Sequence, residues 1–286
     1  MTATTTLSAT SAPGATSVGR WGLIITGSIV GLALFLAAFG GLLAPDALVQ
    51  DILLGATPPG TPGHPLGTDA LGRDVLALLI AGTGSAVAGP VVIALGSMLI
   101  GILVGTVAGY VSGPLDFTVG RVTDLLLALP VVVVAIVIAG IFGSGYWVTV
   151  AMLILLFAPS DIRLVRAAVI EQSARPYIES ARMLRLSTAR IMFRHILPNV
   201  SPIIVTNALV NLAIAIVALS SLSFLGVGVA PDAADWGRQL TDGRSLLLAN
   251  PAAALAPALA IVVVACAVNL LGDAVAARSM SRGGRA

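Results

Sequence analysis

The residues able to perform acid–base, nucleophilic or metal chemistry are few in this sequence of 286 residues. His64, Asp69 and Asp74 offer three possible metal ligands, but their spacing matches no defined metal-binding motif. The only cysteine, Cys266, lies in an apolar run without a partner for a disulfide, and we interpret it as a small packing residue. We therefore predict no catalytic residue and no metal site in this chain.

The elements that must position these residues are membrane-spanning helices. Hydrophobic residues make up 57% of the chain and charged residues 10%, whereas a soluble domain carries about 25% charged residues. The composition therefore predicts an all-α, polytopic membrane protein. A span needs about 20 apolar residues. Six transmembrane helices are predicted, at 21–43, 86–110, 120–142, 147–168, 200–228 and 252–276.

The remaining segments complete the predicted organisation. Residues 1–19 are mostly Thr, Ser, Ala, Gly and Pro and are predicted to form a disordered tail. The apolar run from Trp21 exceeds the core of a signal peptide, about 7–15 residues, which favours an uncleaved first span. We therefore divide the chain into this tail, the first helix with its following loop (20–84), a five-helix core (85–276) that contains the loop 171–198, and a tail (277–286).

The distribution of arginine predicts the orientation. With the N-terminus inside, the cytoplasm receives Arg20, Arg121, the run from Arg163 to Arg194, and Arg278, Arg282 and Arg285. The outside receives only Arg73, Arg238 and Arg244, together with seven aspartates. Both termini are therefore predicted to be cytoplasmic. The small net charge and the clustering of arginine in a few loops do not indicate nucleic-acid binding.

Small residues and proline mark the predicted spans. Gly101, Gly105 and Gly109 share one helix face and predict a close helix contact, either inside the chain or with a second subunit. Pro130 predicts a kink in the third span. The Gly143–Gly145 segment predicts a short turn between the third and fourth spans.

The spans show no site for coupling transport to an energy source. Asp124, Asp161 and Asp273 fall near the predicted cytoplasmic ends of spans, whereas ion-coupled transporters need ionisable residues within the membrane. The chain also lacks a phosphate-binding glycine loop followed by lysine. Any energy source is therefore expected in another subunit.

The loop 171–198 is the longest predicted cytoplasmic segment. Ile178, Ala181 and Leu184 share a helical face, and Ser187 is a suitable N-cap for a second short helix over 188–196. Pro198 predicts a stop before the chain re-enters the membrane. Two short helices along the membrane surface would serve equally to bind anionic lipid or to dock a partner protein.

This loop resembles the coupling loop of bacterial ABC importer permeases, whose signature is Glu-Ala-Ala, three residues, Gly and a later Leu-Pro. Glu179-Ser180-Ala181 and Leu197-Pro198 match the signature, and Arg185 replaces the glycine. Glycine adopts positive φ freely, whereas another residue loses about 1–2 kcal/mol there. The resemblance implies contact with an ATP-hydrolysing subunit through seven residues. These are Tyr177, Glu179, Ser180, Ala181, Arg182, Leu184 and Arg185.

Further segments, in order along the chain, resemble the second permease subunit of dipeptide, oligopeptide and nickel importers. They include His64–Asp74, Arg163-Leu-Val-Arg166, Leu222–Gly228 and Asn269–Asp273, while Leu219 departs from an acid found in relatives. The resemblance implies a type I ABC importer permease in a bacterial plasma membrane, in contact with lipid. Its implied partners are a second permease, two ATP-binding subunits (or one fused) that hold ATP and Mg, and an extracytoplasmic binding protein. The implied substrate is a di- or oligopeptide, with nickel or another small solute as the alternative.

The segments outside the membrane suggest a docking surface. Asp69 is a possible N-cap, followed by an apolar stripe of Leu71, Val75, Leu76 and Leu79. The docking candidates are His64, Asp69, Arg73, Asp74, Trp236, Asp242 and Arg244. Two other functions fit the sequence less well. An ion-coupled secondary transporter requires intramembrane acids that the sequence does not provide, and an intramembrane hydrolase would need His64 and His195, which are predicted to lie on opposite sides of the membrane.

Overall fold

The computed structural model describes residues 20–143, 145–230 and 232–283, and within them the regular elements are all helical. The two isolated β-bridges, Thr61 with His64 and Thr68 with Asp74, lie in the loop before the second helix. The helices are α1 (Arg20–Leu43), α2 (Val75–Val111), α3 (Pro114–Leu127), α4 (Val131–Phe142), α5 (Tyr146–Ser173), α6 (Pro176–Met183), α7 (Thr188–Arg190), η1 (Ile191–Ile196), α8 (Leu197–Phe224), α9 (Trp236–Gly243), η2 (Arg244–Leu246) and α10 (Ala252–Gly283).

Five continuous helical segments are long and apolar enough to cross a membrane, and a sixth span results if α3 and α4 count as one. These two helices meet at an angle of 87°. Pro130 is the N-cap of α4 with φ −64°, so the kink predicted there is a complete break in the third span. The structure therefore has five unbroken spans, and the predicted number of six is reached if this bent pair crosses the membrane as one span.

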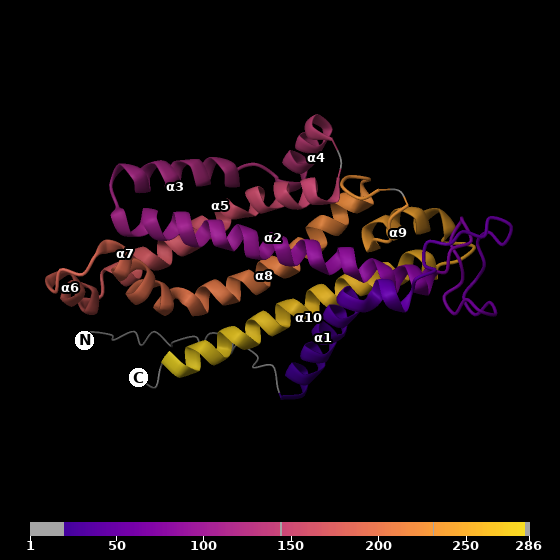
Figure 1. Ribbon diagram of the computed structural model, residues 1–286, viewed down its shortest axis with the longest axis horizontal. Coiled ribbons are helices and arrows are strands. Elements are labelled where there is room, and N and C mark those ends of the chain that lie inside the picture. The colour runs from indigo at the N-terminus through magenta and orange to yellow at the C-terminus, as the bar shows by residue number, and fades with distance from the viewer. Residues whose placement is uncertain (1–19, 144, 231, 284–286) are drawn as a thin grey trace, which may run out of the picture.

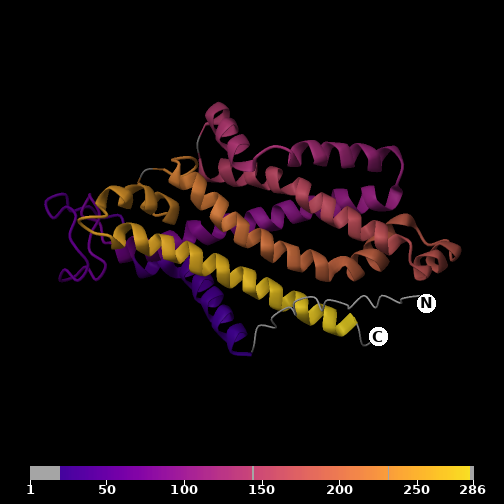
Figure 2. The same ribbon diagram turned by 180° about the vertical axis from the view of Figure 1, so that it is seen from behind.

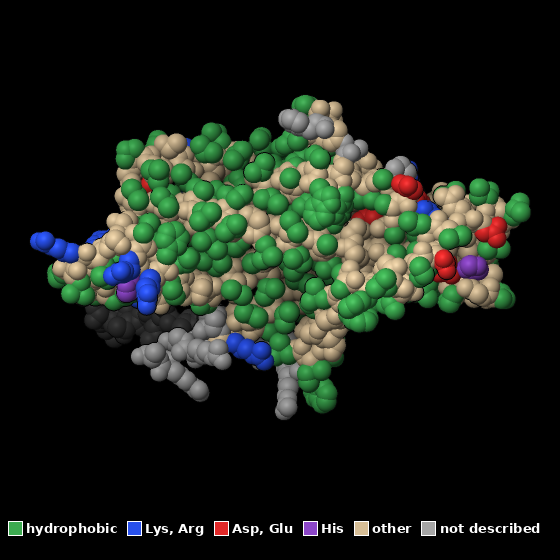
Figure 3. Space-filling model, viewed as in Figure 1, with side chains coloured by type: hydrophobic (Ala, Val, Ile, Leu, Met, Phe, Trp, Pro, Cys, Tyr) green, Lys and Arg blue, Asp and Glu red, His purple; other side chains and the backbone are tan. Residues whose placement is uncertain are grey.

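The long helices α2, α5, α8 and α10 run side by side, and α1 crosses α2 and α10 (Figures 1 and 2). The bundle has two ends, which we name by their short helices. The α6 end holds the turn at 112–113 and the segment 174–187 that contains α6, and the α9 end holds the segments 44–74 and 225–251. On the face shown in Figure 3, arginines gather at the α6 end, acids gather at the α9 end, and apolar side chains cover the surface between them.

The glycines of α2 form the contact predicted for them, and the contact is internal. A Cβ added at Gly101 would lie 2.6 Å from the Asp161 Cβ, and one at Gly105 would lie 2.8 Å from the Ile162 carbonyl oxygen. A Cβ at Gly109 would approach the next turn of α5 as closely. Because the glycines lack side chains, the backbones of α2 and α5 touch directly along three turns.

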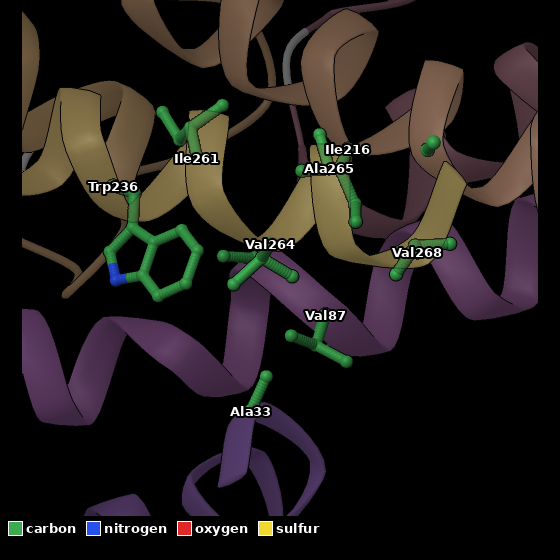
Figure 4. Packing of buried hydrophobic residues seen from close by; sticks show 10 residues of the cluster. Ala33, Val87, Ile216, Trp236, Ile261, Val264, Ala265 and Val268 are labelled. Atoms are coloured by element: carbon green, nitrogen blue, oxygen red, sulfur yellow. The ribbon is translucent and has the colours of Figure 1, made fainter. Parts of the chain in front are cut away.

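The core at the α9 end joins five helices (Figure 4). Val87 of α2, Ile216 of α8 and Val264 of α10 are buried together, and Ala33 of α1 packs against the same cluster. Trp236 at the start of α9 is 3% exposed and donates its indole N–H to the Leu79 carbonyl at 2.9 Å. Burial of the ring and satisfaction of its donor fix α9 against α2.

Several helix bounds differ from those of the predicted spans. Helix α2 begins at Val75, because Asp74, and not Asp69, caps it by accepting a hydrogen bond from the Ala77 N–H. The loop after α1 therefore ends before 84, and Leu71 lies outside the expected helical stripe. Helix α10 continues to Gly283, so most of the predicted tail 277–286 is helical. The predicted disordered segment 1–19 lies outside the described residues.

Candidate functional site

Helix α6 is an amphipathic helix whose ends follow from its sequence. Pro176 occupies the first turn, where its missing N–H is not needed, and Glu179 and Arg182 lie at the ends where their charges favour the helix dipole. Ile178 is fully buried and packs with Val165, Val169 and other core residues. One face of α6 is thus anchored to the bundle, and the other faces outward.

Arg185 ends α6 in the left-handed conformation, with φ +53°. Its N–H donates to the Arg182 carbonyl at 2.9 Å, and the Leu186 N–H donates to the Ala181 carbonyl at 3.3 Å. This pair of hydrogen bonds is the Schellman motif, in which glycine is the usual residue. The turn expected for a glycine therefore forms here with arginine.

Polar contacts connect α6 to three long helices. The Tyr177 hydroxyl donates to Gln172 of α5 at 3.1 Å and accepts from the Asn199 side chain of α8 at 3.2 Å. The Arg182 guanidinium lies 5.2 Å from the centre of the Tyr110 ring of α2. A displacement of α6 therefore acts on α2, α5 and α8 together.

The outward surface of α6 carries apolar and cationic side chains. Met183 is 83% exposed and Leu184 75% exposed. Leu184 was predicted to share a helical face with Ile178 and Ala181, but it lies at the C-cap, beyond the last helical turn. The exposed arginines at this end are Arg175, Arg182, Arg185, Arg190 and Arg194. A surface with exposed apolar side chains among cations is suited to docking an acidic groove on a protein.

The second helix of the loop differs from the prediction. Ser187 caps it as predicted, by accepting a hydrogen bond from the Arg190 N–H. The helix does not stop at Pro198, because residues 191–196 form a π-helix that continues into α8. The Leu197 N–H donates to the Met192 carbonyl, five residues back. This wider turn makes room for the Pro198 ring, and the Asn199 side chain satisfies the His195 carbonyl at 2.7 Å.

The predicted docking residues at the α9 end fall into two groups. Asp69, Arg73 and Trp236 are buried, at 5%, 4% and 3% exposure. These three side chains support the predicted docking surface from below and are not exposed on it, which corrects their prediction as residues that contact the binding protein. The other candidates, His64, Asp74, Asp242 and Arg244, are partly or fully exposed.

An ion-pair network holds this surface together. Arg73 Nε donates to Asp69 at 2.7 Å, and Arg73 also lies 3.6 Å from Asp242 of α9. Asp242 pairs in turn with Arg238 at 3.2 Å. The network therefore attaches the segment before α2 to α9. His64 Nδ1 lies 2.7 Å from Asp74, and the described residues contain no cluster of three potential metal ligands.

Asp235, the N-cap of α9, has a perturbed titration. Its side chain accepts hydrogen bonds from the Arg238 N–H and the Ser85 hydroxyl. Burial raises the pKa of the Asp235 carboxyl above its ordinary value of 3.8, and these hydrogen bonds oppose the shift only in part.

The sequence did not reveal one buried polar cluster. Asp161 was predicted to lie near the end of a span, but it is fully buried in the middle of α5, beside Gly101. One carboxylate oxygen accepts hydrogen bonds from Asn207 at 2.7 Å and Asn211 at 2.6 Å, while the other has no partner. The sequence feature that could have indicated this cluster is the pair of asparagines at 207 and 211, one helical turn apart in one span, with an acid in another span.

The fold defines the class as a multi-pass helical membrane protein with a short helix projecting at one end. A family model described as "Binding-protein-dependent transport system inner membrane component" matches residues 101–281. The chain belongs to this family, and its fold is that of a type I ABC importer permease.

Relatives named for transport functions match most of the chain. The glutathione transport system permease protein GsiD of Pectobacterium atrosepticum is 38% identical over 73% of this chain and 70% of its own length. The dipeptide transport system permease protein DppC of Haemophilus influenzae is 32% identical, over 86% and 88%. The di/tripeptide transport system permease protein DppC of Pseudomonas aeruginosa is 34% identical, over 85% and 82%.

Proposed function

We propose that this chain is one of two permease subunits of an ATP-driven importer of short peptides. Family membership and the functions of the three relatives support a peptide substrate over nickel or another small solute. The partners are a second permease, two ATP-binding subunits (or one fused) that hold ATP and Mg, and an extracytoplasmic binding protein.

The proposal places the α6 end in the cytoplasm of a bacterial cell, with both termini on that side. The gathering of exposed arginines at this end supports the orientation. The α9 end then faces the binding protein, with His64, Asp74, Asp242 and Arg244 on the docking surface.

The observation that carries the proposal is the construction of α6. Ile178 anchors it in the bundle, while Glu179, Arg182, Met183 and Leu184 face outward. In the proposed mechanism, the outward face of α6 and the Arg185 turn sit in a groove of an ATP-binding subunit. ATP binding draws two such subunits together, moves the α6 helices, and switches the side on which the pathway opens.

Replacement of Glu179 by alanine in the complete transporter tests the proposal. We expect peptide uptake per ATP hydrolysed to fall about tenfold, the effect of losing about 1.4 kcal/mol of coupling. The matched control is Glu171→Gln, because Glu171 is an exposed acid that precedes α6 and pairs only with Arg175 within the described contacts. The purified chain alone should show no ATPase activity. Normal uptake after deletion of residues 177–186 would disprove the proposal.

A further inference from the structure

A groove runs along α8 in the half of the bundle nearer the α6 end. It has a volume of about 410 Å³ and lies between α5, α8 and α10. Figure 2 shows α8 and α10 lying side by side over this region. Its α8 wall includes Asn199, Thr206 and Asn207 among apolar residues. These positions fall on one helix face, since residues seven and eight apart return to the same side.

The hydrogen bonds of the two asparagines determine which polar atoms they present to the groove. The Asn207 amide nitrogen donates to Asp161 at 2.7 Å, on the side of the fully buried acid. The same Asp161 oxygen also accepts from the Asn211 amide at 2.6 Å, so the acid holds the amide nitrogen of Asn207 on its own side. That bond uses one amide proton, so the carbonyl oxygen and the second amide proton of Asn207 are left for the groove.

Asn199 is arranged in the same way. Its amide nitrogen donates to the His195 carbonyl at 2.7 Å and to the Tyr177 hydroxyl at 3.2 Å. Both protons of that amide are therefore used within the protein, and its carbonyl oxygen remains free to accept. Eight residues separate Asn199 from Asn207, which corresponds to about 12 Å along α8. The wall thus presents two acceptors about 12 Å apart, with the Thr206 side chain next to the second.

The chemistry of this wall argues against lipid as its occupant. Acyl chains offer no donor, and an amide that faces hydrocarbon loses its hydrogen bonds to water without compensation. Peptides offer N–H donors along an extended backbone at about 3.3 Å per residue, so N–H groups three or four positions apart span the two acceptors, and a shorter peptide contacts them one after the other.

We propose that this face of α8 lines the translocation pathway, where Asn199 and Asn207 accept hydrogen bonds from the backbone N–H groups of a passing peptide. Asp161 is a positioning residue that orients the Asn207 amide. This proposal rests on the proposed function and identifies the part of the chain that the substrate contacts.

Two single-cysteine variants test the proposal, each in the complete transporter with Cys266 replaced by serine. Thr206→Cys lies in the groove, and Val205→Cys is its matched control, because Val205 is the adjacent residue and is 49% exposed outside the groove. We expect a charged, membrane-impermeant thiol reagent to modify Thr206→Cys at least about tenfold faster than Val205→Cys. Transported tripeptide should slow the reaction at position 206 only.

Equal reactivity of the two cysteines, or no effect of tripeptide, would overturn the proposal and assign this face to lipid. Cross-linking of position 206 to the second permease, without modification by the charged reagent, would overturn it in favour of a subunit contact.

A transport measurement tests the acceptor role directly. Uptake of a tripeptide is compared with uptake of its backbone N-methylated form, in the original transporter and in the Asn207→Ala variant, with the same binding protein. The preference for the unmethylated tripeptide should fall several-fold in the variant, whereas a purely structural defect would slow both substrates equally and contradict the proposal. If the unaltered transporter imports no peptide, the proposed function fails, while the cysteine reactivities still report whether this face is open to water.

Discussion

The side chain of Asn211 on α8 donates a hydrogen bond to Asp161 on α5 over 2.6 Å, and both residues are buried. The second donor, Asn207, lies one turn earlier on α8. An acid in the middle of a helix is costly to bury without partners, and two amide donors offset part of this cost. The pair therefore fixes the register of α5 against α8.

Replacement of Asp161 by alanine should destabilise the protein by about 2–4 kcal/mol, because the buried Asn211 amide loses its acceptor at about 1–3 kcal/mol and the half-buried Asn207 amide loses its acceptor at about 1 kcal/mol. The free energy of unfolding in detergent measures the effect. Asp124→Asn is the control, since Asp124 is exposed and its pairing with Arg163 at 3.8 Å is worth at most about 1 kcal/mol. Equal stability of the two variants would contradict the assigned role of Asp161.

Replacement of Gly105 by leucine should separate α2 from α5. The new Cβ would lie 2.8 Å from the Ile162 carbonyl oxygen and 3.0 Å from the Arg166 nitrogen, and backbone atoms cannot rotate aside. We expect a loss of about 1–3 kcal/mol or more, in the range measured for overpacked cores. Thermal unfolding in detergent reports it, with Gly31→Ala as the control because nothing lies within 4 Å of a Cβ there. A Gly105→Leu protein as stable as the control would refute the close contact.

Replacement of Arg185 by glycine should stabilise the turn after α6 by about 1 kcal/mol, because glycine adopts φ +53° without the steric cost of a side chain. Slower hydrogen exchange at the Leu186 N–H, which closes the Schellman motif, measures this effect. Arg185→Val, with a branched side chain at the same φ, should shift exchange in the opposite direction. If exchange slows while ATP-coupled uptake also falls, the arginine side chain contacts the partner in addition to forming the turn.

The pH dependence of stability should contain a contribution from Asp235. Because burial raises its pKa in the folded protein, the folded state holds the proton more tightly than the unfolded chain. The resulting stabilisation is complete below the ordinary pKa of 3.8 and is lost as pH rises through the raised pKa. The thermal midpoint of Asp235→Asn should therefore vary less with pH above 4 than that of the unaltered protein. Asp232→Asn, at an exposed site, should leave the dependence unchanged.

Several local features of the fold could be predicted from the sequence. Ser187 caps its helix, Pro130 interrupts the third span, and the three α2 glycines mark a close contact, because each effect depends on one residue type or on a fixed spacing. Arg185 keeps the turn of the glycine it replaces because the hydrogen bonds of the Schellman motif offset the strain.

The errors arose where competing hydrogen bonds or distant segments decide the outcome. Pro198 was expected to end a helix, but a π-turn preceding it widens the helix, and Asn199 satisfies the carbonyl beside it. Asp69 was predicted to be the N-cap, but its carboxylate pairs with Arg73, and Asp74 caps α2 instead. The surroundings of Asp161 come from α2 and α8, more than 40 positions away, and hydrophobic periodicity within α5 carries no information about them.

The contact between α2 and α5 has a mechanical consequence. With 37 residues at 1.5 Å each, α2 is about 55 Å long, and its glycine face fits against the α5 backbone near the α6 end. Neither helix can slide along the other without driving backbone atoms into overlap. The two helices therefore move as one rigid unit, and a displacement of α6 is transmitted along them with little deformation. The break between α3 and α4, where the two helices meet at 87°, is a separate joint that this contact does not stiffen.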